Sequence, residues 1–165
     1  MIAKRAVTLI FSVSVLIHCS APAPEQVGKD GWLAGSPGEQ MHEVARQLRG
    51  NDVAMWEIGY RYGELYWAGR EENWDLAAYQ LQKIKKSMDL AIVRRPKRAE
   101  SYEVFFANGL PPVTRAVDAK DGESFEAGFQ ALTTACNACH IAENLAFFQV
   151  RQPVYRPAPL GSDGE

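Results

Sequence analysis

Apolar residues recur at intervals of three and four positions through most of this sequence. The stretch 74–94 shows the pattern most clearly, with apolar side chains at Trp74, Ala77, Leu81, Ile84, Met88 and Ala91. Such spacing places the side chains on one face of an α-helix, whereas a half-buried strand needs an apolar residue at every second position. No stretch of the chain sustains that alternation, so the sequence predicts an all-α fold.

The same spacing predicts a short helix followed by longer ones. The ranges are 39–49 for the short helix and 52–68, 74–94, 99–119 and 124–148 for the long ones. Amphipathic helices of this length bury their apolar faces by packing against one another as a bundle. Residues 39–152 are therefore expected to form one domain, which suits a chain of 165 residues that is 47% hydrophobic and 23% charged.

Capping residues indicate where several of these helices begin and end. Asn51 or Asp52 is suited to begin the first long helix, and Gly69 is suited to end it. Asn73 is expected to cap the second. The Pro111-Pro112 pair interrupts the third, and a kink or break is expected there because proline lacks a backbone N–H and clashes with the preceding turn.

The first long segment, 52–68, is apolar on two faces. One stripe comprises Val53, Trp56, Tyr60, Gly63 and Trp67, and the other comprises Met55, Ile58, Tyr62 and Leu65. A helix of this kind is expected to be buried on more than one side, by neighbouring helices or by a flat cofactor. Gly59 and Gly63 would also let a large group or another backbone approach closely.

The most specific chemical signal is the C-x-x-C-H run formed by residues 136–140. Two thiols at this spacing can each add across a vinyl group of haem, and the histidine after them can reach the iron as an axial ligand. Cys136 and Cys139 continue an apolar stripe of the last helix, so they are expected to face inward, with His140 beside them. The motif therefore predicts one covalent haem c bound through Cys136 and Cys139, with His140 as the metal ligand.

Two other uses of a C-x-x-C pair remain as remote alternatives. A thiol–disulfide protein needs the pair at the start of a helix that follows a strand, where the helix dipole lowers a thiol pKa. A structural zinc site needs four ligands, and Cys136, Cys139 and His140 supply only three. No constellation of acid, base and nucleophile indicates catalysis on an organic substrate, so the chain is not expected to be an enzyme.

The N-terminus predicts export. Lys4 and Arg5 precede an uncharged apolar run over 6–17, which has the form of a secretory signal and is too short to span a bilayer. Residues 1–18 are interpreted as a signal peptide. Cleavage before Cys19, which would then carry lipid and anchor the protein to a membrane, competes with cleavage near residues 21–23, an A-x-A pattern.

The mature chain is therefore expected in the bacterial periplasm, either soluble or anchored by lipid. A flexible lead-in over 19–38 is expected before the domain, and a loose proline-rich tail over 153–165 after it. The formal net charge is −2, which gives no basic field for nucleic acid. A local basic cluster does occur at Arg94, Arg95, Lys97 and Arg98. It is interpreted as a solvated helix end or as a docking patch for an acidic redox partner.

With these residues the chain resembles the class II c-type cytochromes, the group of cytochrome c′ and cytochrome c-556. The resemblance covers residues 39–152 and rests on the position of the C-x-x-C-H run, the helix pattern and the export signal. It implies an antiparallel four-helix bundle with the haem on the last helix. It also implies a one-electron carrier that serves periplasmic or membrane-bound redox proteins, and a homodimer formed through the first two helices.

The resemblance also indicates what stands at the sixth iron position. Met55 lies at the corresponding place on the first long helix, where a methionine would give a low-spin electron carrier of the c-556 type. The alternative is a flexible core methionine and a five-coordinate c′-like protein that binds NO or CO. Met41 and His42 would become candidates only if the short helix folds over the haem.

One departure from the family concerns the haem propionates. The family often has Arg or Lys four residues after the ligand histidine, and Asn144 stands there in this chain. Arg151, or an arginine from another helix, is expected to take that role. The residues expected to supply the apolar wall of the haem site are Trp56, Tyr60, Phe106, Phe129 and Phe147.

Overall fold

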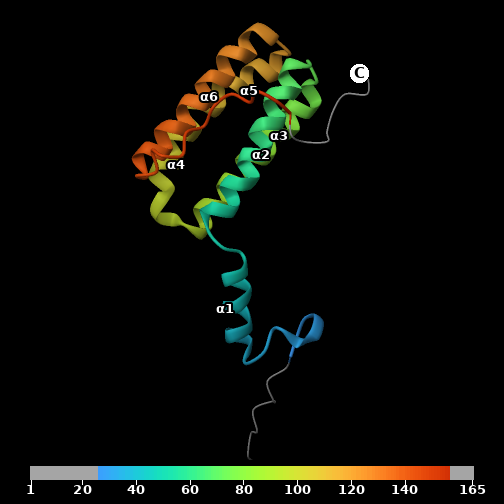
Figure 1. Ribbon diagram of the computed structural model, residues 1–165, viewed down its shortest axis with the longest axis vertical. Coiled ribbons are helices and arrows are strands. Elements are labelled where there is room, and N and C mark those ends of the chain that lie inside the picture. The colour runs from blue at the N-terminus through green and yellow to red at the C-terminus, as the bar shows by residue number, and fades with distance from the viewer. Residues whose placement is uncertain (1–25, 157–165) are drawn as a thin grey trace, which may run out of the picture. The chain divides into compact units, whose positions relative to one another are not determined.

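The computed structural model describes residues 26–156, which form helices joined by short connections (Figure 1). The elements are η1 (Lys29–Gly31), α1 (Pro37–Gln47), α2 (Asn51–Arg70), α3 (Trp74–Arg94), η2 (Pro96–Arg98), α4 (Ala99–Asn108), α5 (Leu110–Ala119) and α6 (Gly122–Ala142). These residues contain no strand, only an isolated bridge between Val27 and Leu33. The predicted all-α fold is therefore confirmed. The predicted signal peptide, Cys19 and the cleavage site near residues 21–23 lie outside the described part of the chain.

The chain divides after Gln47 into two compact units, and α1 belongs to the first. A capping box begins α1, because the Ser36 N–H donates to the Glu39 carboxylate at 2.7 Å and the Ser36 hydroxyl accepts from the Glu39 N–H at 3.4 Å. No residue of α1 is buried. The division thus falls later than the expected start of the domain at residue 39, because α1 has no apolar face covered by neighbours.

The second unit begins with α2 and α3, which pack along each other. The bounds predicted for α3 are confirmed, and the Asn73 side chain caps it by accepting a hydrogen bond of 3.2 Å from the Leu76 N–H. The predicted apolar stripe of α3 is buried, apart from the half-buried Trp74. Local signals were sufficient here because the cap and the stripe agree.

The predicted ends of α2 were wrong. Gly50 caps the helix, rather than either of the two residues that follow it. Gly69 does not end the helix but lies buried inside it, where a Cβ would stand 2.1 Å from the Phe125 ring of α6. The turn is made by Glu72, which has a φ of 55°. Gly69 therefore serves close packing between α2 and α6 rather than a change of direction.

Neighbouring helices cover only one of the two apolar faces of α2. Its buried apolar residues are Ala54, Ile58, Tyr62, Leu65 and Ala68. On the other stripe Val53 and Tyr60 are exposed, and Trp56 is 79% exposed. Packing against α3 and α6 thus covers one predicted stripe. On the other stripe these three residues lie at the surface, whereas Gly63 and Trp67 are half-buried.

The predicted break in the third long segment is confirmed. The segment divides at Gly109 into α4 and α5, and Pro111 and Pro112 stand in the first turn of α5. Proline is tolerated there because the N–H groups of a first helical turn have no partner within the helix. Both α4 and α5 pack on α6.

The last helix begins at Gly122, slightly before the predicted start at residue 124, and it ends earlier than predicted. Asp121 caps α6 by accepting from the Glu123 and Ser124 N–H groups at 3.1 and 3.3 Å. The predicted end at residue 148 was wrong, because α6 stops at Ala142 and Asn144 takes a left-handed φ of 60°. The Leu145 N–H then donates to the His140 carbonyl at 2.7 Å, which closes the end of the helix.

After this turn the chain runs back over the helices as a segment without helix or strand, residues 145–156, here called the strap (red in Figure 1). The strap begins with a turn in which the Phe148 N–H donates to the Leu145 carbonyl at 2.9 Å. The Gln152 side chain donates to Glu126 of α6 at 2.7 Å. Arg156 reaches α2, where its guanidinium lies 2.9 Å from Glu64 and 2.6 Å from Glu71. The part of the predicted loose tail that the structure describes, 153–156, is thus held at its end by ion pairs.

Candidate cofactor site

Two adjoining cavities lie where α2, α4, α6 and the strap meet. The larger has a volume of about 620 Å³ and the smaller about 100 Å³. A volume of the larger size is typical of sites for cofactors and other small molecules. Met55, Cys139 and His140 line both cavities. The smaller cavity is also lined by Cys136. The structure thus brings the cysteines and histidine of the C-x-x-C-H run together with the candidate sixth ligand, Met55.

Burial favours the neutral thiol form of both cysteines. Cys136 and Cys139 lie one turn apart near the C-terminal end of α6, and both are partly buried. Burial raises the pKa of Cys136 to about 12. Burial, together with the nearby Glu143 carboxylate, also raises the pKa of Cys139. Neither thiol therefore has the lowered pKa that thiol–disulfide exchange requires.

The His140 ring is oriented by the strap. Its Nδ1 lies 2.6 Å from the Phe148 carbonyl oxygen. A carbonyl oxygen can only accept a hydrogen bond, so Nδ1 must carry the proton and donate it. In the neutral imidazole, a proton on Nδ1 leaves the lone pair on Nε2, which is the form that binds a metal.

Met55 reaches the same cavities from the opposite element, α2. Its side chain is half-buried and packs against the apolar core. The backbone near it is open, because a Cβ added at Gly59, which also lines the smaller cavity, would meet no atom within 4 Å. Met55 is thus placed to offer a thioether sulfur to anything held between α2 and α6.

Polar groups gather at the larger cavity. Arg98 forms an ion pair with Glu143, whose other carboxylate oxygen accepts from the Ser101 hydroxyl at 2.6 Å. Asn51 donates to the Tyr102 hydroxyl at 2.9 Å, and burial raises the pKa of Tyr102 to about 12. The Asn51 Oδ1 is buried without a hydrogen-bond partner among the described residues. Buried polar atoms normally have a partner, so this oxygen is suited to accept a hydrogen bond from a bound polar group.

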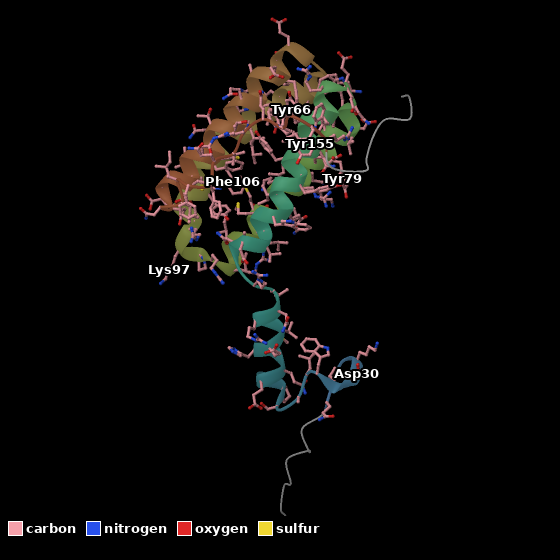
Figure 2. The ribbon with its side chains drawn as sticks, viewed as in Figure 1. Asp30, Tyr66, Tyr79, Lys97, Phe106 and Tyr155 are labelled. Atoms are coloured by element: carbon pink, nitrogen blue, oxygen red, sulfur yellow. The ribbon has the colours of Figure 1, made fainter. Side chains whose placement is uncertain are left out.

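Some side chains of the basic cluster at residues 94–98 line the larger cavity, and others point to solvent. Arg95 and Arg98 line the larger cavity. Lys97 extends outward from the connection between α3 and α4 (Figure 2). Arg95 makes no ion pair with a described residue, and its guanidinium donates only to the Arg94 carbonyl, at 2.9 Å. Arg151 is exposed, bonds to Gln149 and lines neither cavity, so the cavity arginines come from outside α6 and the strap.

The wall of the cavities differs from the expected one. Of the predicted aromatic residues, Trp56 lines the larger cavity, whereas Phe129 is fully buried in the core against Tyr62. Tyr60, Phe106 and Phe147 line neither of the two cavities. The residues that sequence reasoning missed are Asn51, Tyr102, Phe105, Phe148 and Val150. The turn after α6 brings Phe148 and Val150 to the site, and no local sequence pattern predicted that turn.

Met41 and His42 are exposed residues of α1, which belongs to the first compact unit. Among residues 26–156, no group of three or more His, Cys, Asp or Glu side chains is arranged to hold a metal ion. None of the helices in that part of the chain has the length and apolar character of a membrane span. No family model, no curated protein and no solved structure matches the chain.

Proposed function

We propose that this chain is an exported mono-haem c-type cytochrome of the class II kind that acts as a one-electron carrier. In this proposal Cys136 and Cys139 bind the haem covalently, His140 is the axial ligand and Met55 is the candidate sixth ligand. The observation that carries the proposal is that these residues, from helices far apart in the sequence, line one small apolar cavity.

The packing of the helices supports the bundle that the resemblance implies. α2 pairs with α3, and α6 pairs with α4 and α5, which together stand for the third helix of such a bundle. α2 also contacts α6, so the element with Met55 and the element with the C-x-x-C-H run are neighbours. A cofactor between facing helices is a recurrent feature of four-helix bundles.

The residues present fit a haem. Haem, when bound, supplies an iron that exchanges one electron between its ferrous and ferric forms. The neutral thiols of Cys136 and Cys139 are the groups that form thioethers, and His140 presents an unprotonated Nε2. Arg95, which has no carboxylate partner among the described residues, is placed to hold a propionate. The lining of the smaller cavity, which holds both cysteines and His140, is mostly apolar.

The remote alternative, a thiol–disulfide protein, finds less support. The C-x-x-C pair lies near the C-terminal end of α6, where the helix dipole disfavours a thiolate. Burial also disfavours the thiolate, because it raises the pKa values of both thiols. A nucleophilic cysteine needs the opposite environment.

The proposed partners are periplasmic or membrane-bound redox proteins, and the protein would be soluble or anchored through Cys19. A homodimer through the first two long helices is part of the same proposal. It would cover the stripe of α2 that carries Val53, Trp56 and Tyr60, which is exposed in the single chain.

An optical spectrum tests the proposal. The protein should be made in a host that matures c-type cytochromes, and we expect covalent haem with a low-spin spectrum and a methionine-to-iron band in the far red. Changing Cys136 and Cys139 together to Ala should abolish covalent haem. Wild-type protein that carries no covalent haem would refute the proposed function.

The variant Met55→Ala decides between the two kinds of cytochrome. If Met55 is the sixth ligand, the methionine band should disappear and the ferrous protein should gain ready CO binding. Met41→Ala is the matched control, because Met41 is an exposed methionine of α1, outside the unit that holds the cavities. A wild-type spectrum that is already high-spin and shifts with CO or NO would favour the five-coordinate c′-like protein.

A further inference from the structure

The strap is fastened to the C-x-x-C-H run by an asparagine inside the motif. The Asn137 Nδ2 donates to the Val150 carbonyl at 2.9 Å, and the Asn137 Oδ1 accepts from the Val150 N–H at 2.8 Å. An amide side chain is suited to this task, because its donor and acceptor match the acceptor and donor of one backbone residue. Asn137 therefore clamps the backbone of Val150 to α6.

A second bond joins the same two elements one helical turn further on. The Phe148 carbonyl, two residues before the clamped Val150, accepts the proton on His140 Nδ1 at 2.6 Å. The side chains around that carbonyl are largely exposed, 59% for Phe148 and 73% for Phe147. On the N-terminal side the Phe148 N–H donates to the Leu145 carbonyl at 2.9 Å. On the C-terminal side, the clamp at Asn137 is the nearest anchor for the carbonyl that orients the His140 ring.

We propose that Asn137 is a positioning residue for His140, acting through Val150 and the Phe148 carbonyl. This inference rests on the proposed function, in which His140 Nε2 binds the haem iron. A hydrogen bond from Nδ1–H to a carbonyl fixes the tautomer and makes the imidazole a stronger donor to a metal. Asn137 would therefore tune the ligand without touching the cofactor.

The test uses the mature protein and compares Asn137→Leu and Asn137→Ala with Asn108→Leu and Asn108→Ala. Asn108 is a matched control, because it is also a helical asparagine, and its side chain donates to the Val104 carbonyl and not to the strap. Two quantities are measured: hydrogen exchange of the Val150 amide and the reduction potential. Leu keeps the size of Asn, and Ala favours the helix, so one variant serves if the other folds poorly.

For the Asn137 variants we expect the Val150 amide to exchange on the order of tenfold faster, the effect of losing one hydrogen bond. We also expect a positive shift of the reduction potential, since a weaker imidazole donor stabilises ferric iron less. The Asn108 variants should change neither quantity.

The outcomes separate this inference from the proposed function. Wild-type protein without covalent haem would defeat the proposed function and, with it, the role of Asn137. Haem-loaded variants with faster exchange at Val150 but an unchanged potential would show that Asn137 only fastens the strap. An equal shift of the potential in the Asn108 variants would likewise overturn the positioning role.

Discussion

At the scale of single residues, burial decides the chemistry of the site. Cys136 is surrounded by apolar side chains, and this environment raises the pKa of its thiol from 9.0 to about 12. A buried neutral thiol is protected from oxidation, because the thiolate is the reactive form. The raised pKa thus disfavours the thiolate form of Cys136.

The raised thiol pKa predicts how stability depends on pH in protein made without haem. Between about pH 9 and 12 the unfolded chain loses the Cys136 proton and the folded chain retains it. The free energy of unfolding should therefore fall as pH rises through this window. Urea denaturation at several alkaline pH values measures it.

The matched control for the alkaline experiment is Cys136→Ala, which lacks the thiol. Tyr62 and Tyr102 remain in this variant, and burial raises the pKa of each from 10.0 to about 12, so part of the alkaline loss should persist. An identical pH dependence in both proteins would contradict the burial of the Cys136 thiol.

At the scale of the elements, close contact between α2 and α6 places Met55 near the C-x-x-C-H run. Gly69 leaves room for a side chain of α6, since a Cβ there would stand 2.1 Å from the Phe125 ring. Phe125 in turn packs against Phe129, with ring centroids 5.8 Å apart. The spacing of the helices at the cavities thus depends on a glycine at the far end of α2.

Gly69→Ala should destabilise the protein by about 1–3 kcal/mol, because the added methyl group forces the Phe125 ring to move within a packed core. Gly63→Ala is the control on the same helix. A Cβ at Gly63 would meet no atom within 4 Å, so the higher helix propensity of alanine should stabilise the protein by about 0.5–1 kcal/mol.

Urea denaturation of the two glycine variants measures both effects. Equal stability changes in the Gly69 and Gly63 variants would argue against the close approach of α2 and α6. In Gly69→Ala we also expect a weaker methionine-to-iron band, since a wider separation of the helices moves Met55 away from His140.

At the scale of the whole molecule, the strap ties the end of the chain to α2. Glu64 is 1% exposed, and its carboxylate pairs with Arg156 at 2.9 Å. Arg156→Met should therefore cost about 3 kcal/mol of stability, because it leaves a buried carboxylate without a partner. The double variant Glu64→Gln with Arg156→Met should recover most of the loss.

A double-mutant cycle by urea denaturation gives the coupling between Glu64 and Arg156. Additive effects of the two substitutions would mean that the strap is not held at α2. Arg151→Met is the control, because Arg151 is exposed and bonds only to its neighbour Gln149. It should change stability by less than about 0.5 kcal/mol.

Local patterns were sufficient for some elements and insufficient for others. α3 follows its prediction because its cap at Asn73 and its apolar stripe both depend on near neighbours in the sequence. The end predicted for α2 was wrong because a glycine can either end a helix or allow close packing inside one. The contact of Gly69 with the ring of Phe125 shows that it serves close packing. The end of α6 was missed for the same reason, since the turn at Asn144 depends on where the strap goes next.

The sequence by itself determined the helical class, the break before Pro111 and the spacing of the C-x-x-C-H run, because each depends on residues within a few positions of one another. Only the tertiary structure decided that Met55 shares a cavity with Cys136, Cys139 and His140. It also decided that the strap returns to α2, where Arg156 meets Glu64 across a separation of 92 residues. Contacts of this kind arise from the packing of whole helices, which no short pattern in the chain encodes.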